Sequence, residues 1–131
     1  EALETWPLTV PAVKDSIHII GSAMSHFDSP IIGTLGAYTT AHATEPTLVI
    51  EGKDVSVEGL KIVGPTGDFP VVQVNEDLAV LQHTWLRGRD DGGNGLDFPA
   101  GAHFFSKVAH NWIDSYVAAA VAVEIAQESV T

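Results

Sequence analysis

The sequence predicts an all-β solenoid, a fold in which short strands stack rung upon rung. One pattern occurs three times, at steps of 24 and 27 residues: VSVEGLKIVG (55–64), AVLQHTWLRG (79–88) and SKVAHNWIDS (106–115). A second column of apolar pairs repeats at steps of 24, 24 and 25, as Leu48 with Ile50, Val72 with Val74, Leu96 with Phe98, and Val121 with Val123. A period of this size is typical of repeats that bury their apolar faces on one another.

Aligning the three copies on their last residue predicts which side chains share a column inside the solenoid. The columns are Val57 with Leu81 and Val108, then Leu60 with Thr84 and Asn111, then Ile62 with Leu86 and Ile113. Because strand side chains alternate between two faces, we expect these positions to point inward and the residues between them to point outward.

Composition excludes several classes of partner. Seventeen acidic and six basic residues give a formal charge of −11, which disfavours binding to nucleic acid or to an anionic membrane. No apolar run approaches about 18 residues, so no membrane span is predicted. The chain has no cysteine, so the compartment cannot be read from disulfides. Because it starts at Glu1 without a signal-like segment, we expect a processed product or an excised piece.

We expect one domain over residues 1–131, opened by an edge segment over 1–15. There Leu8 and Val10 alternate like a strand, and prolines at 7 and 11 place that strand at a sheet edge. A second strand follows in SIHIIG (16–21), with Ile17 and Ile19 on one face.

Residues 22–46 form a long loop excursion from the first rung in this interpretation, and residues 47–125 form the regular rungs. The excursion carries His26, His42 and Glu45, whose spacing fits no metal motif, so we expect no metal site there. Near the end of the chain, YVAAAVAVEIAQ (116–127) suits either a helix or a strand. The step of 25 residues from Leu96 and Phe98 favours a strand.

The strings VSVEGLKIVG, GNGLDF and HNWIDSYVAAAVAVE resemble rungs of the right-handed parallel β-helix, the fold of pectate-lyase-like enzymes and phage tailspikes. The resemblance covers roughly residues 8–125 and implies about four to five rungs. It is poor evidence of function, since the same fold serves lyases, hydrolases, adhesins and virion proteins.

The candidate binding face carries two indoles. Alternation sends Lys61 and Val63 outward, together with their equivalents: Trp85 with Arg87, and Trp112 with Asp114. His83 and His110 fall at the preceding bend, where stacked imidazoles are commonly a packing ladder rather than a metal site. The aromatic face suits a sugar ring or a protein partner. The open alternative is that the chain's own N-terminal segment or long loop covers it.

The segment RGRDDGGNG (87–95), continuing to Asp97, is the candidate catalytic region. Asp90, Asp91 and Asp97 could act as acid and base in glycoside cleavage, with Arg87 or Arg89 holding a uronate. The same oxygens also suit calcium. The simplest interpretation is a solvated turn, which needs Asp, Asn and Gly. The acid clusters of polygalacturonases and the Lys and Arg set of calcium pectate lyases are not recognisable here.

The sequence therefore favours a non-catalytic structural and binding module without a cofactor, resembling a tail fibre, tailspike or capsid decoration protein. We expect a homo-oligomer, a trimer foremost, or contact with other virion proteins, in an extracellular or virion location. A glycan ligand stays open. The alternative is a carbohydrate-active enzyme, either a polysaccharide lyase or a glycoside hydrolase, or a fragment of one.

Overall fold

A computed structural model describes residues 7–21, 31–32, 45–65, 67–88, 95–99, 106–114 and 123–125. Within these ranges every regular element is a β-strand and none is a helix, which confirms the all-β prediction. It follows that this part of the chain holds no helix of the length and apolar character needed to cross a membrane.

The strands form three parallel sheets. Sheet A contains β1 (Leu8–Val10), β4 (Leu48–Ile50), β7 (Val72–Val74), β10 (Leu96–Phe98) and β13 (Val123–Ile125). Sheet B contains β2 (His18–Ile20), β5 (Ser56–Glu58), β8 (Val80–Gln82) and β11 (Lys107–Ala109). Sheet C contains β3 (Ile31–Ile32), β6 (Lys61–Val63), β9 (Trp85–Arg87) and β12 (Trp112–Asp114).

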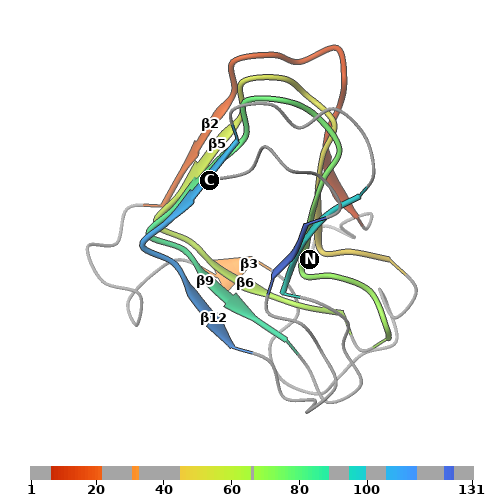
Figure 1. The fold of residues 1–131 in the computed structure, drawn as a ribbon, viewed down its shortest axis with the longest axis vertical. Coiled ribbons are helices and arrows are strands. Elements are labelled where there is room, and N and C mark those ends of the chain that lie inside the picture. Colours follow the sequence, from red (N-terminus) through yellow and green to blue (C-terminus); the bar gives the residue numbers. More distant parts are fainter. Residues whose placement is uncertain are drawn as a thin grey trace, which may run out of the picture.

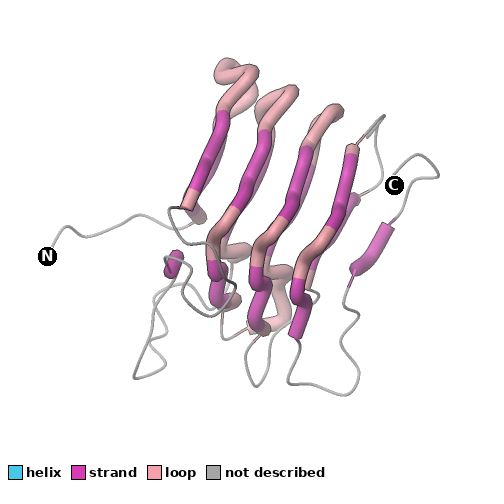
Figure 2. Tube along the Cα trace, turned by 90° about the vertical axis from the view of Figure 1, so that its left-hand side faces the viewer, coloured by secondary structure: helices cyan, strands magenta, loops and turns pink. Residues whose placement is uncertain are grey.

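The chain visits the sheets in the order A, B, C and then returns to A, and we call one such passage a rung. Figure 1 looks along the stack, with sheets B and C on two sides of the shared interior. Figure 2 shows the strands of successive rungs side by side. Parallel strands in stacked sheets are compatible with the predicted β-helix.

The register confirms two predicted columns, which line the core from sheets B and C. They are Val57, Leu81 and Val108, and Ile62, Leu86 and Ile113. In the middle rungs these side chains are fully buried, whereas Val108 and Ile113 on the last described rung are only partly buried. The same alternation buries Leu48, Val72 and Leu96 in sheet A. Burial of these apolar side chains is the main source of stability in such a fold.

The last member of the sheet A column was predicted wrongly. Val123 and Ile125, rather than Val121 and Val123, pair with Leu96 and Phe98. The step is therefore 27 residues, the same as between β8 and β11. Because a shift of two residues keeps every side chain on its face, the apolar pattern alone cannot distinguish the two registers.

Within the described residues, left-handed backbone conformations turn the chain at the corners between sheets B and C and between sheets A and B. Between sheets B and C the residues are Gly59 (φ 67°), His83 (φ 52°) and His110 (φ 55°). Between sheets A and B they are Ser16, Asp54 and Leu78, with φ of 56°, 57° and 62°. Two residues suffice for each B–C corner after β5, β8 and β11. Such short corners keep successive rungs in register.

The first rung is closed by a strand inside the segment predicted as an excursion. There β3 pairs with β6, placing Ile32 beside Ile62. His26 and His42 lie outside the described residues. The predicted strands before it are confirmed, since β1 is an edge strand and Ile17 and Ile19 both pack on the core.

Candidate functional site

The candidate site is the outer surface of sheet C, which we call the sheet C face. Its outward positions form two rows across β6, β9 and β12, namely Lys61, Trp85 and Trp112, and Val63, Arg87 and Asp114. Residues of a row are direct neighbours on adjacent strands, about 4.8 Å apart. The parallel register thus brings the two predicted indole positions side by side.

Trp85 is held by two cations. The Nζ atom of Lys61 lies 3.8 Å from the centroid of the Trp85 ring, and Cζ of Arg87 lies 5.9 Å from it. Both distances are within the range in which an ammonium or guanidinium group is attracted by the ring. Lys61 therefore occupies one side of Trp85, and this indole is only partly exposed.

Trp112 differs, because 56% of its surface is exposed. It lies on β12, the last strand of sheet C in the described part of the chain. A large indole in contact with water is unfavourable for an isolated chain. The alternative that the chain's own N-terminal segment or long loop covers the indoles involves residues outside the described ranges and is not tested.

Val63 departs from the predicted face. Its register partner is Arg87, so its position is outward, yet only 5% of its surface is exposed. The chain that follows is buried as well, at Gly64 and Pro65, and the hydroxyl of buried Thr47 donates to the Val63 carbonyl at 2.7 Å. The corner that follows β6 is thus packed, and Val63 is not part of the exposed surface of the sheet C face.

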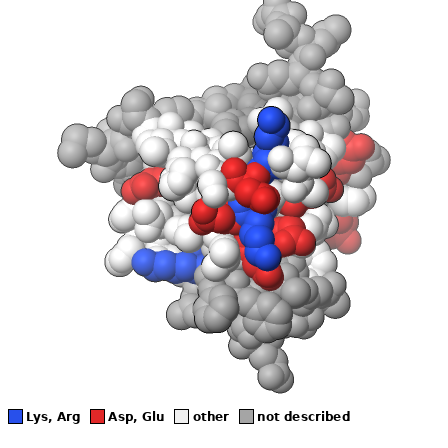
Figure 3. Space-filling model, turned by 90° about the horizontal axis from the view of Figure 1, so that it is seen from above, with Lys and Arg blue, Asp and Glu red and all other residues white. Residues whose placement is uncertain are grey.

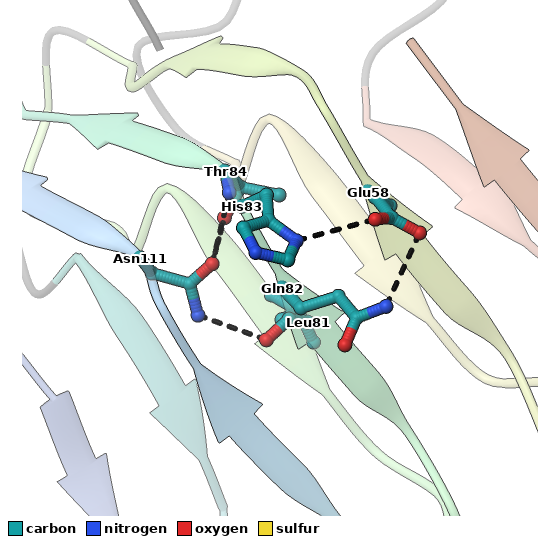
Figure 4. A network of polar contacts seen from close by, with 6 residues as sticks. All are labelled: Glu58, Leu81, Gln82, His83, Thr84 and Asn111. Atoms are coloured by element: carbon teal, nitrogen blue, oxygen red, sulfur yellow. Dashed lines mark hydrogen bonds and ion pairs between the residues drawn. The ribbon is translucent and has the colours of Figure 1, made fainter. Parts of the chain in front are cut away.

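The corner between sheets B and C carries a polar network (Figure 4). The His83 and His110 rings stack with centroids 5.3 Å apart and an angle of 6° between their planes. Nδ1 of His83 lies 3.2 Å from one Glu58 carboxylate oxygen, and Gln82 donates to the other at 3.1 Å. The stacking of the two rings confirms the predicted histidine ladder.

Asn111 connects the same corner to the interior. Its Oδ1 accepts hydrogen bonds from the backbone N–H and the hydroxyl of Thr84, at 2.9 and 2.8 Å. Its Nδ2 donates to the Leu81 carbonyl at 2.9 Å. Thr84 is fully buried, so these bonds satisfy groups that water does not reach.

Acidic side chains gather around lysine at the corner between sheets A and B (Figure 3). Lys53 lies 3.5 Å from the Asp77 carboxylate, and its backbone N–H donates to Asp15 at 3.0 Å. The Ser16 hydroxyl donates to Asp54 at 2.8 Å. Among the described residues, no three histidine or acidic side chains are grouped to hold a metal ion. This corner thus combines the Lys53–Asp77 ion pair with two carboxylates that accept hydrogen bonds.

The predicted acid and base are not brought together in the described ranges. Asp97 occupies the outward position of β10, between the buried Leu96 and Phe98. Asp90 and Asp91 lie outside those ranges, as does Arg89. Acid–base catalysis at this segment therefore stays a prediction.

Sequence reasoning missed Glu58 as a partner of the histidine ladder. The alignment held a signal, since Glu58 precedes Gly59 as Gln82 precedes His83, so the pair was already in one column. It also missed Asn111 as a hydrogen-bonding residue, although the alignment placed it beside Thr84. The stacking of Lys61 on Trp85 depends on side-chain conformation and had no signal in the spacing.

No family model matches the chain, and no curated protein or solved structure is similar enough to count as a match.

Proposed function

We propose that the chain is a right-handed parallel β-helix of about four to five rungs that serves as a non-catalytic structural and binding module. It assembles through the sheet C face, as a homotrimer, in a virion component such as a tail fibre, tailspike or capsid decoration protein. The path A, B, C with parallel strands supports the β-helix. The right hand follows from the strong preference of parallel crossovers for that hand.

The exposure of Trp112 is the observation that carries the proposal. Aromatic residues are enriched at the centres of protein interfaces and often supply a large share of the binding energy. A neighbouring copy that covers this indole removes apolar surface from water.

The rigidity of the face supports the same function. Lys61 and Arg87 both lie close to the Trp85 ring, and the backbone N–H of Trp112 donates to the carbonyl of Thr84, directly before β9, at 2.9 Å. A surface that is already ordered loses little conformational entropy when it binds. Glycoside cleavage requires two placed carboxyl groups. The enzyme is the weaker candidate because the acid clusters of polygalacturonases and the Lys and Arg set of calcium pectate lyases are not recognisable in the sequence.

Replacing Trp112 with Ala tests the proposal. Loss of a central aromatic contact should weaken self-association by about 2 kcal/mol or more, which is roughly 30-fold. Sedimentation velocity should then show smaller species for Trp112→Ala at concentrations where the wild type is trimeric, with an unchanged circular dichroism spectrum.

Val13→Ala is the matched control, because Val13 is 85% exposed and lies between β1 and β2, away from the sheet C face. It should leave the oligomer intact. A wild-type protein that is monomeric at all concentrations, or a trimer that is unaffected by Trp112→Ala, would contradict assembly through this face.

A further inference from the structure

The Lys61 side chain reaches from β6 onto the ring of Trp85 in β9. The two residues are register neighbours, and the Lys61 Nζ atom lies 3.8 Å from the ring centroid. At that distance the ammonium group is in direct contact with the face of the ring, well inside the limit of about 6 Å for a cation–π contact. The Arg87 guanidinium, at 5.9 Å, lies close to this limit. Lys61 is therefore the cation that covers one face of the indole.

Trp85 and Trp112 differ in exposure although they occupy equivalent positions. They are direct neighbours on β9 and β12 (Figure 1). Trp85 is only partly exposed, whereas 56% of the Trp112 surface is exposed. Without the Lys61 contact, the row would offer two adjacent aromatic surfaces to a partner. The contact thus limits how much of this row can take part in binding.

Burying Trp85 against a partner would disturb the ammonium group. A partner that packs on the covered face must either displace Lys61 from the ring or enclose its charge in the interface. A charge that is removed from water without a new partner is costly. Displacement gives up the attraction between the cation and the ring. Lys61 therefore directs a partner away from Trp85 and toward Trp112.

We propose that Lys61 is an autoinhibitory cap on the sheet C face. It keeps Trp85 out of the contact, so that Trp112 is the indole that a second copy covers. The association of copies is then weaker than two indoles would make it. Exposed cation–π contacts are individually weak, and Lys61 is itself partly exposed, so the cap is reversible. This regulatory role rests on the proposed function, since it concerns the same face and the same partner.

Solvent exposure of the Trp85 ring tests the cap directly. The chain has three tryptophans, so Trp6→Phe together with Trp112→Phe leaves Trp85 as the only one. In this background, Lys61→Ala should make the Trp85 fluorescence more sensitive to quenching by acrylamide. Lys61→Arg should leave the quenching unchanged, because arginine restores a cation that stacks on aromatic faces. Unchanged quenching after Lys61→Ala would overturn the cap, whether or not the protein assembles.

The association of copies, measured with the native tryptophans in place, tests the autoinhibition. Lys61→Ala should tighten self-association by about tenfold, or about 1.4 kcal/mol, because Trp85 adds a second aromatic contact. Removing one of the six basic residues takes the net charge from −11 to −12, which by itself increases the repulsion between copies. Tighter association therefore cannot come from the change in charge. Lys107→Ala is the matched control, since it makes the same change in charge at an exposed position on β11 of sheet B, and it should not tighten association.

Sedimentation equilibrium of the wild type and these variants separates the cap from assembly through Trp112. A wild type that stays monomeric while Lys61→Ala assembles would support the cap and contradict assembly through Trp112 alone. Lys61→Arg should associate like the wild type. Lys61→Ala that associates no more tightly than the wild type, or a tightening that Lys107→Ala reproduces, would overturn the autoinhibitory role while leaving the effect of Trp112→Ala untouched.

Discussion

The B–C corners after β5, β8 and β11 share one backbone conformation but differ in their residues. Gly59, His83 and His110 all adopt left-handed φ values, which glycine accepts freely and histidine more readily than a β-branched residue would. The next residue then faces the interior, as Leu60, Thr84 or Asn111. Among the described residues, Thr84 and Asn111 place hydrogen-bonding side chains at this position, and Asn111 accepts from both the backbone N–H and the hydroxyl of Thr84.

Asn111→Leu should destabilise the fold for this reason. It removes the acceptor for the buried Thr84 groups and the donor to Leu81, and a buried polar group left without a partner costs about 1–3 kcal/mol. Urea unfolding followed by circular dichroism measures the change.

Combining Asn111→Leu with Thr84→Val is the informative control. The double variant removes the Thr84 hydroxyl as well, so its loss should be smaller than the sum of the two single losses. Fully additive losses would mean that the hydroxyl and Asn111 do not act as a pair.

At the level of elements, the strands were largely predictable because their signal is local. Alternation of period two and a nearly constant step placed β5, β8 and β11 in one register from the sequence alone. The register of β13 was missed because the last rung is longer, and alternation does not distinguish shifts of two residues. The strand at Ile31–Ile32 is too short to show a period.

For the sheet C face, the sequence predicted which residues are neighbours on adjacent strands, but it did not predict the contacts of their side chains. The alignment placed Trp85 beside Trp112, which the register reproduces. Lys61 stacking on one indole, and the burial of Val63, depend on the packing of segments distant in sequence. Such packing leaves no pattern in the spacing of residues along the sequence.

Leu81→Ala measures how strongly the central column stabilises the stack. Leu81 is fully buried between Val57 and Val108, so its truncation leaves a cavity and should cost about 2–5 kcal/mol. Val13→Ala, at a surface position, should change the free energy of unfolding by less than about 0.5 kcal/mol. Equal effects in chemical unfolding would show that the column is not packed as described.

At the scale of the whole molecule, net charge and exposed apolar surface have opposite effects on the association of copies. A net charge of −11 keeps copies apart, and the corner between sheets A and B carries acidic side chains, of which Asp77 pairs with Lys53. The exposed indole of Trp112 favours contact. Apolar contacts between like-charged copies strengthen when repulsion is screened, whereas contacts made of ion pairs weaken.

Salt should therefore strengthen the association of copies through the sheet C face. Raising salt from about 0.05 to about 0.3 M shortens the Debye length from about 14 to about 6 Å, which removes much of the repulsion between copies. The measurement is sedimentation equilibrium of the wild type at both salt concentrations. The trimer fraction should rise with salt in the wild type and stay near zero in Trp112→Ala. A trimer that dissociates as salt rises would mean that ion pairs, and not the indole row, hold the copies together.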